Sequence, residues 1–144
     1  MLSPATLLMH CTTRIEAVGN NLNASLGTGF FYHLPSLVDG EFFPAIITNK
    51  HVIEGAHTVN LQLQISPLGV EPNDDGTAAG EQRWAVSLAL TNLVVSHPNP
   101  DIDLCAIMIA PILNSVPNGM NLKHMFLNSS WRLNEDEAPH IRPI

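Results

Sequence analysis

Charged residues are scarce in this chain of 144 residues: they make up 13% of it, against 45% apolar residues. Disordered and coiled-coil chains carry far more charge, so this composition excludes both classes. Lysine and arginine number only six and form no cluster. Since a nucleic-acid surface needs a concentrated positive patch, we expect no nucleic-acid partner. The net charge of −7 favours solubility and indicates little else.

Long apolar runs and cysteines are missing as well. No run approaches the ~20 residues that cross a bilayer, so we expect no membrane partner. The first ten residues lack the basic start of a secretory signal, and Pro4 interrupts them. Two cysteines, Cys11 and Cys105, are too few for a disulfide framework. The sequence therefore favours two buried thiols in a reducing compartment, which predicts a cytoplasmic location.

Turn-forming residues are plentiful, because eleven prolines and nine glycines are scattered along the chain. Many turns between short elements are typical of an all-β fold. Apolar and polar residues alternate cleanly over residues 58–65, as in a half-buried strand. Six antiparallel strands that close on themselves would form a small barrel without exposed edges. The segments that we expect as strands are Thr6–Val18, Leu26–His33, Phe42–Thr48, Thr58–Ile65, Arg83–Val95 and Ile102–Ile109.

The regions between and after these segments carry weaker signals. A helix that starts near His51 should end after about one turn, at Gly55. Near the carboxyl end, Leu122–Leu127 is a candidate short helix. Residues 134–144 are polar and interrupted by prolines, which predicts an irregular tail.

Two short segments contain residues suited to catalysis. Residues 48–56 read Thr-Asn-Lys-His-Val-Ile-Glu-Gly-Ala, and residues 101–107 read Asp-Ile-Asp-Leu-Cys-Ala-Ile. Serine-type catalysis needs a base that takes the hydroxyl proton and a carboxylate that orients the base. His51 follows one apolar strand segment and Asp103 directly precedes another. Asp101 is the rival carboxylate, but it follows Pro100 and is more typical of a turn, so we favour Asp103.

These segments resemble those of trypsin-like serine peptidases, in particular the bacterial, HtrA-like branch of the chymotrypsin-fold group. In that branch the histidine segment reads Thr-Asn-x-His-Val-[Val/Ile]-x-Gly-Ala, which residues 48–56 match throughout. A preceding Gly-[Ser/Thr]-Gly-Phe strand matches Gly27–Phe30, and the aspartate segment maps to Asp103–Ile107 with Cys105 in place of a small residue. The resemblance covers roughly residues 7–111. It implies that His51 is the general base and that Asp103 is its orienting partner.

The same resemblance implies a domain organisation. Residues 1–112 would form an antiparallel six-stranded barrel, the first of the two barrels of that fold. Residues 113–144 would be an irregular linker or tail, or the start of the second barrel. The second barrel supplies the serine, the oxyanion hole and the substrate pocket, and no Gly-x-Ser-Gly-Gly motif is present. Ser129 and Ser130 have no neighbouring glycine and are expected to be ordinary loop serines.

The expected function follows from this incomplete pattern. The chain would be the N-terminal portion of a trypsin-like serine endopeptidase, inactive alone, whose partners are a polypeptide substrate and a missing second barrel. The alternative is a non-catalytic module, derived from the same half-barrel, that binds a protein partner. No cysteine, histidine or aspartate grouping has metal-ligand spacing, and no cofactor is expected.

Overall fold

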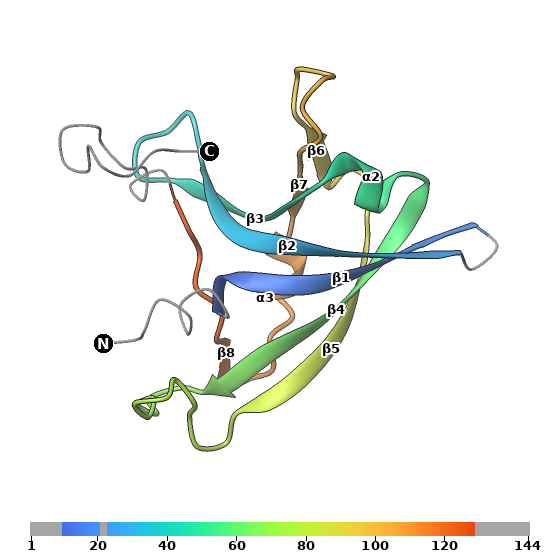
Figure 1. Ribbon diagram of the computed structural model, residues 1–144. Coiled ribbons are helices and arrows are strands. Elements are labelled where there is room, and N and C mark those ends of the chain that lie inside the picture. The colour runs from blue at the N-terminus through green and yellow to red at the C-terminus, as the bar shows by residue number, and fades with distance from the viewer. Residues whose placement is uncertain (1–9, 21–22, 129–144) are drawn as a thin grey trace, which may run out of the picture.

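The computed structural model describes residues 10–20 and 23–128, and it is an all-β fold built on one antiparallel sheet of eight strands. The strands follow one another in the order β5-β4-β1-β2-β3-β7-β6, and β8 pairs with β4 beside this path. The sheet curls strongly, with β4 and β5 on one side of β1 and β2, and with β3, β6 and β7 on the other (Figure 1). The strands are β1 (Thr12–Gly19), β2 (Ala24–Pro35), β3 (Phe42–Thr48), β4 (Ala56–Pro67), β5 (Gln82–Ala89), β6 (Val94–Ser96), β7 (Cys105–Met108) and β8 (Met120–Leu122).

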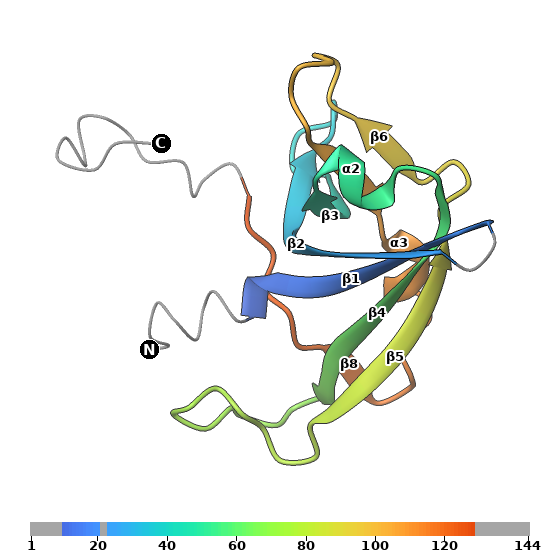
Figure 2. The same ribbon diagram turned by 45° about the vertical axis from the view of Figure 1, so that its right-hand side comes forward.

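The core lies inside this curl. The predicted alternation in β4 is confirmed, because its four apolar side chains are at most 1% exposed while their polar neighbours face outward. Apolar residues from β1, β2, β3 and β7 meet three of them, Val59, Leu61 and Leu63, to form one cluster. Figure 2 shows how the strands wrap around this interior. Its largest fully buried members are Phe31, Ile15, Ile46, Leu61, Leu63, Ile107 and Ile109. The prediction of two buried thiols is also confirmed, at Cys11 and Cys105.

The strand expected over Arg83–Val95 is divided in two, so the prediction of a single strand there is wrong. β5 ends at Ala89 and β6 starts at Val94. Between them Asn92 has a φ of 61°, in the left-handed region that asparagine adopts more readily than most residues. Leu93 N–H then donates to Leu90 C=O over 3.0 Å, which closes a turn. As a result β5 pairs with β4 and β6 pairs with β7, and the sheet is not closed by hydrogen bonds between β5 and β6.

The expected helix at Leu122–Leu127 is also wrong. Leu122 ends β8 and pairs with Ile65, and Lys123 N–H donates to Gln64 C=O over 2.9 Å. Further along, Leu127 bridges Tyr32 on β2. This segment is extended because its backbone N–H and C=O groups form hydrogen bonds with β4 and β2. Those bonds replace the ones that the same groups would form within a helix.

Two short helices lie wholly within the described residues. The helix α2 (Lys50–Ile53) has about one turn, as expected, and Gly55 follows it with a φ of 73°. The helix α3 (Ala110–Leu113) was not predicted; it carries Pro111 in its first turn, where a proline costs no hydrogen bond. Residues 6–9 of the first expected strand, Ser129, Ser130 and the tail at 134–144 lie outside the described residues.

Candidate functional site

Strand pairing brings the two predicted site residues to one end of the sheet. In the β3–β7 pair, Thr48 lies opposite Cys105. The chain that leaves β3 after Thr48 carries His51 on the first turn of α2, and the chain that enters β7 at Cys105 carries Asp103 two residues earlier. The register of this one pair therefore places the imidazole and the carboxylate together.

Both carboxylate oxygens of Asp103 contact His51. Oδ2 is hydrogen-bonded to Nδ1 of the imidazole, and Oδ1 accepts the backbone N–H of His51 over 3.0 Å. The side-chain amide of Asn49 donates to the backbone oxygen of Asp103 over 2.9 Å. The carboxylate is thus oriented by two donors of His51 and its backbone is held by a third group.

The rival Asp101 makes different contacts. Its backbone N–H donates to Oδ1 of Asn99 over 2.9 Å, as in a turn. Within residues 10–20 and 23–128, no hydrogen bond joins Asp101 to His51. Of the two aspartates that the sequence offered, the structure brings Asp103 to the imidazole.

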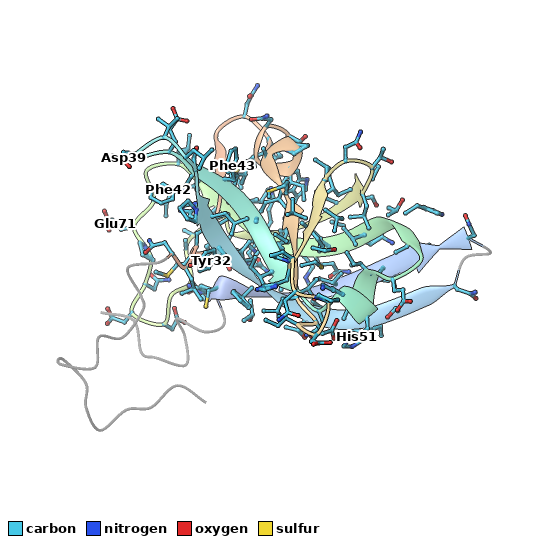
Figure 3. The ribbon with its side chains drawn as sticks, turned by 90° about the horizontal axis from the view of Figure 1, so that it is seen from above. Tyr32, Asp39, Phe42, Phe43, His51 and Glu71 are labelled. Atoms are coloured by element: carbon cyan, nitrogen blue, oxygen red, sulfur yellow. The ribbon has the colours of Figure 1, made fainter. Side chains whose placement is uncertain are left out.

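The imidazole of His51 and the carboxylate of Asp103 stabilise each other electrostatically, and both are open to solvent. The hydrogen bond from the His51 side chain lowers the pKa of Asp103, and the small burial of the carboxyl opposes this effect. Asp103 therefore remains a carboxylate at neutral pH and accepts at both oxygens. Because Nδ1 is engaged, Nε2 is the ring nitrogen left to take a proton from another group. The His51 side chain is 68% exposed, and it lies at the opposite end of the sheet from Asp39 and Phe42 (Figure 3).

Two glycines of β2 leave room for close packing, Gly27 against α2 and Gly29 against the neighbouring strands. A Cβ at Gly27 would come within 2.6 Å of a methyl group of Val52, the buried residue of α2. A Cβ at Gly29 would come within 2.5 Å of a methyl group of Ile46. Between them, Thr28 C=O accepts the hydroxyl of Thr48 over 3.0 Å. Of the Gly-Thr-Gly-Phe segment singled out in the sequence, Gly27 therefore packs against the helix that carries His51, and Thr28 holds the end of β3 that leads into it.

Lys50 takes part in the site although sequence reasoning did not select it. Its ammonium group donates to the backbone oxygens of His97 and Asn99, over 3.1 and 3.2 Å. Both acceptors belong to the loop that carries Asp103. Backbone oxygens have no sequence signature, so only the position of Lys50 beside His51 could have pointed to it.

No nucleophile, metal site or membrane helix is found in the described part of the chain. No serine hydroxyl there is hydrogen-bonded to His51, and no group of three or more histidine, cysteine, aspartate or glutamate side chains is arranged to hold a metal ion. Burial raises the pKa of Cys105, so its thiol is not an activated thiolate. None of the helices described has the length and apolar character needed to cross a membrane.

This arrangement can take up a proton at Nε2 of His51 and stabilise the imidazolium that forms. Comparisons with protein-family models, with curated proteins and with solved structures found no match for this chain.

Proposed function

We propose that this chain supplies the general base and the orienting acid of a serine-peptidase site of the trypsin-like type, and that another polypeptide segment supplies the nucleophile. The observation that carries the proposal is the two-point contact of Asp103 with His51. A surface ion pair needs one contact only, whereas a catalytic pair needs a fixed imidazole orientation and tautomer. Engagement of both carboxylate oxygens supports the second reading.

We also propose that the curled sheet is the first barrel of that fold. In this reading β5 and β6 are the two halves of one bent strand. The hydrogen bond from Leu90 N–H to His57 C=O extends the β4 side of the bend, and the one from Met108 N–H to Leu93 C=O extends the β7 side. Only Thr91 and Asn92 then interrupt the backbone hydrogen bonds around the core. The bend at these two residues would explain why the sheet is not closed.

The chemistry would proceed as follows. Nε2 of His51 takes the proton of a serine hydroxyl as the oxygen attacks a peptide carbonyl, and it later gives the proton to the leaving amine. Asp103 stays ionised and stabilises the imidazolium between these steps. The serine and the backbone N–H groups that stabilise the oxyanion would come from outside the described residues, among which no hydroxyl is hydrogen-bonded to His51.

A second candidate function is a non-catalytic module that binds a protein partner. The turn between β2 and β3, together with the start of β3, supports it, because four large apolar side chains there are about half exposed or more: Leu37, Val38, Phe42 and Phe43. An exposed apolar patch of this kind is typical of a protein-binding surface. It lies away from His51, so binding there would need neither His51 nor Asp103 (Figure 3).

A fluorophosphonate probe, which labels activated serines, distinguishes the two functions. The full chain is tested alone and with a second-barrel polypeptide of a trypsin-like peptidase that carries Gly-x-Ser-Gly-Gly. We expect no labelling and no casein hydrolysis by the chain alone. In the mixture we expect labelling of the added serine, lowered by about 10³-fold or more in His51→Ala, in line with the cost of removing a triad member.

Two results would contradict the catalytic proposal. Casein hydrolysis by the chain alone that is lost in His51→Ala would show that no outside nucleophile is needed. Labelling in the mixture that is equal for wild type, His51→Ala and Asp103→Asn would show that the pair is not the base. Binding of the second polypeptide without labelling, abolished by Phe42→Ser with Phe43→Ser, would favour the binding module instead.

A further inference from the structure

The loop that carries Asp103 runs from β6 to β7 over residues 97–104, and it is exposed. Its own contacts fix its shape. His97 N–H donates to Leu104 C=O over 2.9 Å, and Ile102 N–H donates to Asn99 C=O over 3.1 Å. These bonds join one part of the loop to another. They do not determine where the loop lies relative to α2, which carries His51.

Three successive residues make that connection. Asn49 and His51 hold the end of the loop at Asp103. Lys50, between them, holds its beginning, since one ammonium group donates to the backbone oxygens of both His97 and Asn99. The loop is therefore attached to the α2 segment at both of its ends.

The position of Lys50 in α2 supports this function. It belongs to a helix of only four residues, which is too short to give a cation a favourable dipole. Its ammonium group instead points to two backbone oxygens, and hydrogen bonds from a charged donor are stronger than those between neutral groups. The favourable partners of Lys50 are thus in the Asp103 loop, not in its own helix.

We propose that Lys50 is a positioning residue, which clamps the beginning of the 97–104 loop and so keeps the Asp103 carboxylate on His51. The catalytic role of this clamp rests on the proposed function. The attachment of the loop to α2 by Lys50 can be tested whether or not the site is catalytic. The ammonium group of Lys50 acts through the loop, at the backbone oxygens of His97 and Asn99. Without it, the loop would remain attached to the α2 segment at one end only, and it would separate from α2 more often.

Amide hydrogen exchange of the full chain, followed by NMR, measures this opening at the backbone N–H of His51, which donates to Asp103. We expect Lys50→Met to speed exchange at His51 by about fivefold, the effect of losing roughly 1 kcal/mol of net hydrogen bonding. Lys50→Arg keeps the charge and the donors and should stay within about twofold of wild type. The amide of Val52, which donates to Asn49 C=O over 3.1 Å, reports whether α2 itself stays folded.

If Lys50 acted only through its charge, Lys50→Met would change the exchange rate at His51 in the opposite direction. Hydroxide catalyses amide exchange at neutral pH and a cation attracts it, so loss of a cation without loss of a clamp would slow exchange at His51. Arg83→Gln removes one exposed positive charge on β5 and should leave the His51 rate unchanged. Slower or unchanged exchange at His51 in Lys50→Met would overturn the clamp.

Asp103→Ala separates the clamp from the proposed function. It removes the acceptor of the His51 amide and should speed exchange more than Lys50→Met does. If Asp103→Ala speeds exchange and Lys50→Met does not, the clamp fails and the His51–Asp103 pair stands. If neither variant speeds exchange, the contact does not form in solution and both proposals fail.

Discussion

His124 makes the stability of this protein sensitive to mild acid. Its Nε2 accepts the backbone N–H of Gln64 over 3.0 Å, so Nδ1 must carry the proton, and it faces the backbone oxygen of His10 at 3.2 Å. The ring also stacks on Phe31, with centroids 4.5 Å apart. Burial lowers the pKa of His124 from its ordinary value of 6.5 to about 4. The neutral ring therefore belongs to the folded state.

The sign and size of the effect follow from the two pKa values. Below pH 6.5 the unfolded chain binds a proton at this histidine while the folded chain does not, so stability falls as pH falls and levels off below about 4. Between about pH 7 and about pH 5 the loss from this one group is about 2 kcal/mol. Protonation would also end the acceptance of the Gln64 N–H by Nε2.

Urea unfolding at these two pH values measures the effect, with tryptophan fluorescence as the signal and an unchanged slope as the check on two-state behaviour. Other groups titrate in the same range, so the comparison is with His124→Gln, which keeps an amide donor and acceptor and does not titrate. We expect wild type to lose about 2 kcal/mol more than this variant. Equal losses in the two proteins would refute the reasoning.

Two further substitutions test the packing that supports the site. Gly27→Ala should lower stability by about 2 kcal/mol in thermal unfolding, because its Cβ would lie 2.6 Å from a methyl group of Val52. Adding Val52→Ala should recover part of this loss, and no recovery would argue against the contact. Ile107→Ala, at a fully buried position, should cost about 3 kcal/mol in urea unfolding. The matched change Ile102→Ala, at a position 36% exposed, should cost under about 1 kcal/mol, and equal costs would contradict the assigned core.

Local periodicity was sufficient to predict much of the sheet. The apolar segment Phe42–Thr48 is β3 with the same bounds, and the alternating segment 58–65 lies within β4. The prediction failed where apolar residues continue on both sides of a bend. Residues 88–90 and 93–95 are apolar, and the left-handed turn at Asn92 between them carries no glycine or proline to mark it. The prediction of a helix over Leu122–Leu127 failed for a different reason. The partners of this segment lie on β2 and β4, far away in the sequence.

The site was predictable only in part. The segments around His51 and Asp103 could be read from the sequence, and the structure brings these two side chains together. Their catalytic roles and the trypsin-like type of the fold stay predictions. The contribution of Lys50 could not be read, because its acceptors are backbone oxygens. The same holds for His124, whose partners are backbone groups of Gln64 and His10.

The pairing of Thr48 with Cys105 between β3 and β7, the rung next to the site, has a consequence for the order of folding. These residues are far apart in the chain, so a long loop must close before the rung can form, and such contacts are slow to appear. The hairpin of β2 and β3 is local and requires no such closure. The imidazole and the carboxylate should therefore meet only after the sheet has curled, and amide protection at His51 should arise later in refolding than protection within the hairpin.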